Sequence, residues 1–145
     1  MSDKKKCYIN CTWVLPKSDK SIKVINPATE DVCAEISLGL KEDVNDAVLS
    51  AKEAFKTWAF SSKKERLEPL EKLYDLYKKR WSDIAETITT EMGAPKDFAT
   101  KLQAGTGAAH IKPFIRYLNE FDFETPLGKQ AMNQRLIYEP NGVGA

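Results

Sequence analysis

Hydrophobic and polar residues alternate along the N-terminal part of the chain with a period of two, which is typical of half-buried β-strands. The alternation is clearest over residues 21–25 and 32–37, which lie on either side of a turn. Residues 8–9 and 12–14 form a shorter pair ahead of them. We therefore expect a small antiparallel β meander over residues 6–38.

At Lys41 the period changes from two to about 3.6 residues, the repeat of an α-helix. Hydrophobic positions then recur at intervals of three and four as far as Trp58, and this stripe is the strongest helix signal in the sequence. It comprises Val44, Ala47, Val48, Ala51, Ala54, Phe55 and Trp58. The pattern predicts helices over most of residues 41–121.

A second helix is predicted to begin after Ser62, because Ser62 and Glu65 have the spacing of a capping box. In this motif the hydroxyl and carboxylate groups bond the free backbone N–H groups of the first turn. Pro69 lies inside the predicted helix, where proline removes a backbone donor and clashes with the preceding turn. We expect either a bend at Pro69 or a helix that begins later.

Further helices and a final strand complete the predicted order of elements. Ser82 is a candidate cap for a helix over residues 83–92, which Gly93 would end as a left-handed residue. A longer helix is expected over residues 97–121, with a kink at its internal proline. After a turn, β-like residues return over 130–138.

Length, composition and charge limit the function classes. The 145 residues have the size of one domain, which normally buries about 68–70% of its unfolded surface around its own core. Lys and Arg number 22 against 21 Asp and Glu, so no global field attracts nucleic acid or an anionic membrane. The sequence also lacks a secretory signal and an apolar run of membrane-spanning length, which predicts a cytoplasmic protein with reduced thiols.

Few residues could perform chemistry. His110 is the one histidine, and Cys7, Cys11 and Cys33 are the three cysteines. A zinc site from these four is disfavoured, because two of the cysteines fall in predicted strands and His110 falls on a distant helix. We expect buried, inert thiols and a histidine at a packed boundary. The run from Gly105 to His110 comes close to a dinucleotide-binding fingerprint, but it lies inside a helix, where packing glycines are expected.

Five short motifs follow one another along the chain. They are Tyr8 to Val14, Val24 to Thr29, Asp43 to Trp58, Glu91 to Pro95 and Tyr138 to Val143. Spread over more than a hundred residues, the motifs are specific together although each is weak alone. In this order and spacing they resemble the N-terminal part of the NAD(P)-dependent aldehyde dehydrogenases, with features of a bacterial member. Cys11 departs from that pattern, which usually has glycine there.

The resemblance implies a fold class and a division of the chain. The complete parent would be an α/β protein with a Rossmann-like cofactor domain, of which this segment is mainly helical with the N-terminal β meander and a C-terminal β-strand. Residues 1–124 would form the N-terminal part of the NAD(P)-binding domain. Residues 125–138 would form the first strand or strands of an oligomerisation ribbon, and residues 139–145 the start of the link into the cofactor-binding core.

The resemblance assigns no catalytic and no cofactor-binding residue to these 145 positions. In the family the nucleophilic cysteine, the glutamate base, the oxyanion-stabilising asparagine and the cofactor-binding helix all lie downstream. NAD or NADP would bind the complete parent, and none is expected to bind this segment. The resemblance also implies part of a monovalent-cation site, to which the backbone carbonyls of Val24 and Ile25 and the carboxylate of Glu91 would contribute. A further carbonyl ligand in the family lies beyond these residues, so the set within the chain is incomplete, and the alternative for Glu91 is an ordinary surface glutamate at a helix end.

Two functional hypotheses follow. The first is an N-terminal portion of an enzyme that oxidises an aldehyde to a carboxylic acid with NAD(P)⁺, inactive without the remainder of its chain. That parent would be a homo-oligomer, a dimer or tetramer, with no nucleic-acid or membrane partner. The alternative is a truncated, stand-alone homologue that acts as a non-catalytic interaction or assembly module, using its exposed last strand and helix faces.

Overall fold

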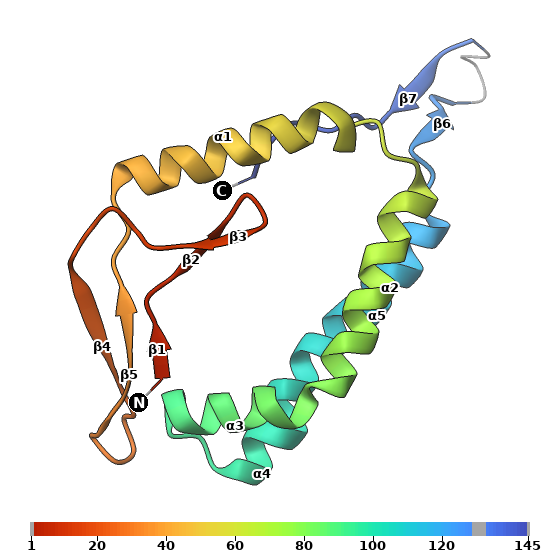
Figure 1. The fold of residues 1–145 in the computed structure, drawn as a ribbon. Coiled ribbons are helices and arrows are strands. Elements are labelled where there is room, and N and C mark those ends of the chain that lie inside the picture. Colours follow the sequence, from red (N-terminus) through yellow and green to blue (C-terminus); the bar gives the residue numbers. More distant parts are fainter. Residues whose placement is uncertain (1, 129–132, 145) are drawn as a thin grey trace.

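The computed structural model describes residues 2–128 and 133–144 of the chain. Its elements follow one another around an open ring, drawn in Figure 1. Strands form one side of the ring, helix α1 (Lys41–Trp58) spans the top, and helices α2 (Lys63–Lys79) and α5 (Ala104–Glu120) run side by side along the opposite side. Helix α3 (Trp81–Met92) closes the bottom.

The N-terminal strands form two small sheets rather than a single meander. Strands β2 (Cys7–Ile9) and β3 (Thr12–Val14) pair antiparallel as a hairpin. Strands β4 (Ser21–Ile25) and β5 (Val32–Ser37) form a second antiparallel pair. The predicted antiparallel pairings are therefore confirmed. Strand β1 (Ser2–Lys4) was not predicted, and it joins the second sheet by pairing parallel to β5.

The tip of the β2–β3 hairpin is a two-residue turn. Asn10 and Cys11 both have positive φ angles, of 50° and 57°. Positive φ at both central residues is the geometry of a type I′ turn, whose twist matches that of the flanking strands. Cys11 therefore lies in the turn and not in a strand as expected.

Helix α1 begins at a buried carboxylate that the sequence analysis did not single out. Asp43 is 7% exposed and accepts a hydrogen bond from the backbone N–H of Leu40 at 2.7 Å. The same carboxylate accepts from the backbone N–H of Lys17 at 3.1 Å. Because one charged group satisfies donors from two segments, it fixes the start of α1 against the chain that leaves β3.

Helix α2 begins as predicted, with Ser62 accepting from the backbone N–H of Glu65 at 3.3 Å and Glu65 accepting from that of Ser62 at 2.7 Å. The helix includes Pro69, so the expected later start is wrong. The predicted Ser82 cap of α3 is also wrong, because α3 begins at Trp81 and follows α2 after a single residue, Arg80.

The long C-terminal helical region is interrupted in its hydrogen bonding. A short turn, α4 (Lys96–Phe98), leads into a π-helical segment, η1 (Ala99–Gln103), and then into α5. The indole N–H of Trp81 donates to the Thr100 carbonyl at 2.9 Å, within η1. A π segment leaves carbonyls without their usual helical donors, and here a side chain from α3 supplies one.

After α5 the chain forms a projecting hairpin of β6 (Glu124–Pro126) and β7 (Arg135–Ile137). The expected strand over residues 130–138 is thus found at 135–137, and positions 130–132 lie outside the described residues. Among the described strands, β7 is paired by β6 on one side, and its other edge is free. Arg135 and Glu124 form a cross-strand ion pair.

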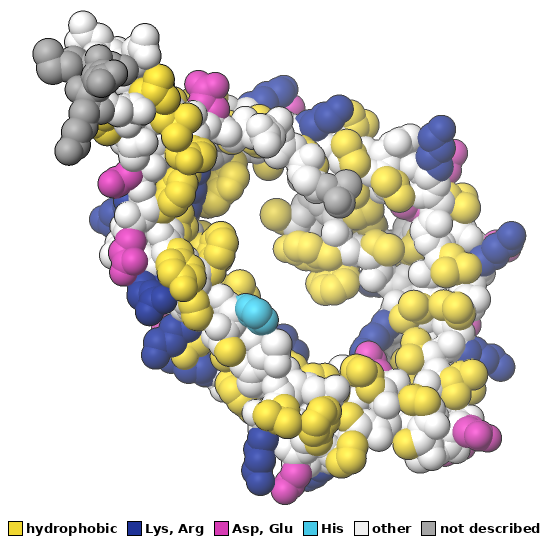
Figure 2. All heavy atoms as spheres, turned by 180° about the vertical axis from the view of Figure 1, so that it is seen from behind, with side chains coloured by type: hydrophobic (Ala, Val, Ile, Leu, Met, Phe, Trp, Pro, Cys, Tyr) yellow, Lys and Arg dark blue, Asp and Glu magenta, His cyan; other side chains and the backbone are white. Residues whose placement is uncertain are grey.

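The described residues bury little apolar surface. The buried hydrophobic residues are all alanines, namely Ala34, Ala85, Ala99, Ala104 and Ala108, and no large side chain is fully buried among them. Figure 2 shows hydrophobic side chains around the inner rim of the ring. The expectation that 145 residues enclose a core of their own is therefore not met.

Candidate functional site

The end of α3 and the turn after β4 meet in very close contact. Gly93 ends α3 with a φ of 66°, in the left-handed region. A Cβ atom placed on Gly93 would come within 2.6 Å of the Ala28 Cβ and 2.8 Å of the Asn26 Oδ1. Both the φ angle and the lack of space require glycine here. Two of the motifs that were noted in the sequence are therefore brought together in space.

The predicted cation-binding residues lie around this junction. Two of the three predicted ligands, the Val24 carbonyl and the Glu91 carboxylate, already have a partner. The Val24 carbonyl accepts a hydrogen bond from the Cys33 thiol at 3.3 Å. Glu91, in the last turn of α3, accepts from the ammonium of Lys4, with 2.6 Å between Nζ and Oε1. The strand register shifts between Val24 and Ile25, so the β ladder is irregular where the two carbonyls lie.

Carbonyl and carboxylate oxygens are suitable ligands for a hard monovalent cation. The Glu91 carboxylate, however, is the one charged ligand in the predicted set, and the Lys4 ammonium already neutralises it. As the structure stands, the set therefore does not fit a free cation. The cation site remains a prediction.

A pocket of about 350 Å³ opens beside this ion pair. It is lined by residues of β1, β5 and α3, and Lys4 is the one cationic side chain among them. The acidic lining residues all lie on α3 and are Asp83, Glu86 and Glu91. The pocket is therefore acidic apart from the Lys4 ammonium.

The cysteines and the histidine do not gather. Cys7 and Cys33 are half-buried, Cys11 is exposed, and all three are free thiols. His110 is exposed on α5, so the expected position at a packed boundary is wrong, as is the expected burial of the thiols. Within residues 2–128 and 133–144, no group of three or more His, Cys, Asp or Glu side chains could hold a metal ion.

Gly105 and Gly107 lie inside α5 and serve packing, as predicted. A Cβ on Gly107 would come within 2.3 Å of the Tyr77 hydroxyl oxygen. That hydroxyl donates to the Ala104 carbonyl at 2.8 Å. The close approach of α2 and α5 therefore depends on the absence of a side chain at position 107.

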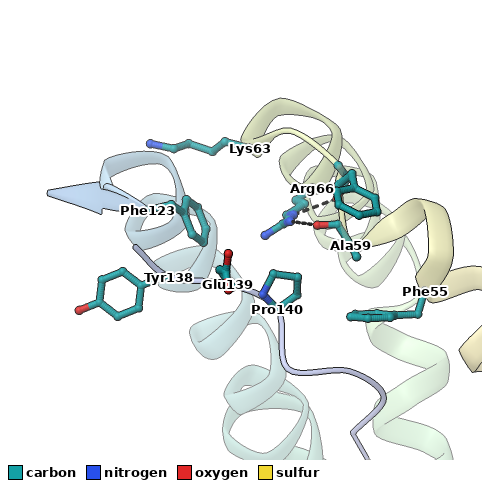
Figure 3. Close-up of a pocket in the computed structure, with 10 residues that line it drawn as sticks. Phe55, Ala59, Lys63, Arg66, Phe123, Tyr138, Glu139 and Pro140 are labelled. Atoms are coloured by element: carbon teal, nitrogen blue, oxygen red, sulfur yellow. Dashed lines mark hydrogen bonds between the residues drawn. The ribbon is translucent and has the colours of Figure 1, made fainter. Parts of the chain in front are cut away.

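A second pocket, of about 510 Å³, lies where the β6–β7 hairpin meets the loop between α1 and α2 (Figure 3). Arg66 is fixed there by hydrogen bonds to Ser61 Oγ at 2.9 Å and the Ala59 carbonyl at 3.2 Å. Its guanidinium lies 5.4 Å from the centre of the Phe123 ring. Arg66 was not predicted, because nothing in the local pattern indicates that residues 66 and 123 meet.

The comparisons with known proteins agree with the motifs. The model of the aldehyde dehydrogenase family matches residues 13–145. The chain belongs to the aldehyde dehydrogenase family. One curated relative, the 3-succinoylsemialdehyde-pyridine dehydrogenase of a Pseudomonas species, is 42% identical over 99% of this chain and 29% of its own length.

Solved structures show that the fold is that of aldehyde dehydrogenases. The aldehyde dehydrogenase of Bartonella henselae is 46% identical and superimposes with a TM-score of 0.87 over 89% of this chain and 27% of that one. A mutant of aldehyde dehydrogenase C from Pseudomonas syringae, complexed with NAD⁺ and octanal, is 35% identical with a TM-score of 0.82, over 86% of this chain and 26% of that one. The family and the partial fold are thus as expected.

The chain spans little more than a quarter of the length of these relatives, and it matches their N-terminal portion. The alternative of a stand-alone interaction module is not favoured, because the matched relatives named above are dehydrogenases. No helix among the described residues is both long and apolar enough to cross a membrane.

Proposed function

We propose that this chain forms the N-terminal portion of an NAD(P)-dependent aldehyde dehydrogenase, which oxidises an aldehyde to a carboxylic acid. The observation that supports this most directly is the match in fold over 89% of the chain to only 27% of the Bartonella henselae enzyme. The wide apolar exposure of the described residues adds support, because such surface is normally covered in a complete domain.

The chain's part in this function is structural. Residues 1–124 contribute the first strands and helices of the cofactor-binding domain, and residues 139–145 lead into its remainder. NAD or NADP, bound by the complete enzyme, would accept the hydride from the substrate. No residue of these 145 is assigned to the chemistry or to the cofactor.

Residues 125–138 form the beginning of an oligomerisation ribbon in this proposal, and the complete enzyme is a cytoplasmic dimer or tetramer. The geometry of the β6–β7 hairpin supports the assignment. The hairpin projects from the body, and among the described strands β7 is paired only by β6. Leu136 and Ile137 are 43% and 60% exposed. A free strand edge with exposed apolar residues is suited to pairing with another chain.

A chimaera tests the proposal. Residues 1–145 would replace the matching segment of the Bartonella henselae enzyme, and reduction of NAD⁺ and of NADP⁺ would be followed by absorbance with an aldehyde that the unaltered Bartonella enzyme oxidises. We expect activity from the chimaera and none from the 145-residue chain alone. The unaltered Bartonella enzyme, assayed with the same aldehyde and both cofactors, serves as the control. A folded chimaera that lacks activity, or turnover by the chain alone, would contradict the proposal.

A further inference from the structure

The ion pair of Lys4 and Glu91 connects two segments that are 87 residues apart in the sequence. Its two charged atoms are 2.6 Å apart, and the side chains are 46% and 35% exposed. Strand β1 holds the backbone of Lys4 in parallel register with β5, with Lys4 opposite Ile36. Strand pairing therefore fixes the backbone that carries the ammonium, and the ion pair directs the side chain to α3.

Glu91 needs a cation from outside its own helix. It lies in the last turn of α3, where free carbonyl groups give the helix end a negative partial charge. That turn contains no basic residue. Glu86 lines the same pocket and adds further negative charge, while Asp83, also in the lining, is paired with Arg80 at 3.7 Å. An acidic residue at this end of a helix is unfavourable unless a cation compensates it.

We propose that the Lys4 ammonium is a built-in cation, which takes the place of the monovalent ion that the family resemblance implies at Glu91. The ammonium is attached to the chain, so it does not depend on the concentration of Na⁺ or K⁺. Its presence explains why the predicted ligand set does not fit a free ion. Glu91 accordingly needs no particular alkali cation to balance its charge, and removal of the ammonium leaves its carboxylate free to take one.

Binding of sodium tests this in the chimaera described above, where residues 1–145 are joined to the remainder of the Bartonella henselae enzyme. In these measurements, the unaltered chain is that chimaera without further substitutions. The broadening of the ²³Na resonance would be measured at constant ionic strength, with choline as the replacement cation. We expect the unaltered chain and its Glu91→Gln variant to broaden the resonance equally. Lys4→Met should broaden the resonance, and adding Glu91→Gln to it should remove that broadening. Lys6→Met, a substitution of the same kind two residues away, is the matched control and should behave as the unaltered chain.

Thermal unfolding gives a second measurement. Replacing choline by Na⁺ should raise the melting temperature of Lys4→Met by about 2–4 °C, because a ligand that binds only the folded state stabilises it. The unaltered chain and Lys4→Arg, which keeps the positive charge, should show no such rise.

Two results would overturn the proposal. One is broadening of the ²³Na resonance by the unaltered chain that Glu91→Gln abolishes. The other is a Lys4→Met variant that is folded, as shown by its helical circular dichroism, and yet binds no sodium. Neither readout requires catalytic activity, so failure of this proposal is separate from failure of the proposed function.

Discussion

Gly107 lies at the closest approach of α2 and α5, and its neighbour Gly105 provides a matched comparison. A methyl group on Gly107 would overlap the Tyr77 ring and displace the hydroxyl that bonds Ala104. A methyl group on Gly105 would meet the Trp81 ring at 3.8 Å, an ordinary contact. The two glycines belong to one helix and share its backbone preference, so any difference between their variants reflects packing.

We predict that Gly105→Ala raises the free energy of unfolding by up to about 1 kcal/mol, the usual gain in a helix. Gly107→Ala should be less stable than Gly105→Ala by about 1–3 kcal/mol, because overpacking offsets that gain. Urea denaturation followed by circular dichroism would measure both variants. Equal stability of the two would show that Tyr77 moves aside without cost.

Cys11 provides the second prediction at the scale of one residue. Its φ of 57° is costly for a residue with a Cβ, by about 1–2 kcal/mol, and type I′ turns prefer glycine at this position. Cys11→Gly should therefore raise the free energy of unfolding by about 1 kcal/mol. Cys11→Ala keeps the Cβ and should give no gain, which separates backbone strain from loss of the thiol. Denaturant titration in the presence of a reducing agent checks both.

Among the elements, the first turn of α2 has a stability that depends on pH. Hydrogen bonds from the side chain and the backbone N–H of Ser62 lower the pKa of Glu65 below its ordinary value of 4.5. A lowered pKa in the folded state means that the ionised form is the one that stabilises. The contribution of Glu65 is thus complete above about pH 4.5 and is lost as the pH falls through the folded pKa.

Glu65→Gln should accordingly reduce stability at pH 7 and lose this pH dependence. Ser62→Ala should cost about 1 kcal/mol at pH 7, the usual loss for a helix cap. Glu68→Gln, one turn later and outside the capping box, is the control. Unfolding free energies from pH 7 down to pH 3 would measure the effect. A difference between the unaltered chain and Glu65→Gln that stays constant down to the lowest pH would contradict the capping role.

The elements differ in how far the sequence predicts them. Helices α1 and α2 follow from a long apolar stripe and a capping box, which are local signals. Strand β1 has three polar residues and no alternation, and its pairing with β5 depends on a contact distant in sequence. The π segment has the residues of an ordinary helix, and a hydrogen bond from Trp81 accompanies its altered backbone.

The residues of the candidate site also differ in how far the sequence predicts them. Glu91 and the turn after β4 could be identified from motifs, and Gly93 from its place after a helix. Lys4 could not, because an isolated lysine near the N-terminus carries no local indication of a partner 87 residues away. Arg66 and Phe123 are a similar case, since only the folded chain brings them together.

For the whole molecule, the main physical feature is apolar surface without a matching core. Phe60 is 87% exposed and Leu49 is 64% exposed, while the buried hydrophobic residues are alanines. Burying apolar surface stabilises by about 25 cal/mol per Å², so side chains left in water contribute little to stability. The ring in Figure 2 is therefore expected to gain most of its stability from whatever covers its inner face.

We predict that the 145-residue chain binds a hydrophobic dye such as ANS, and that the remainder of the Bartonella henselae enzyme, added in trans, suppresses the dye fluorescence. The sequences are 46% identical in the matched region, so the apolar faces should be complementary. Light scattering should detect a one-to-one complex. The Bartonella enzyme's own N-terminal segment should compete for that remainder and restore the fluorescence of this chain. Unchanged fluorescence, with no complex detected, would mean that the matching part of the Bartonella enzyme does not cover the inner face of the ring.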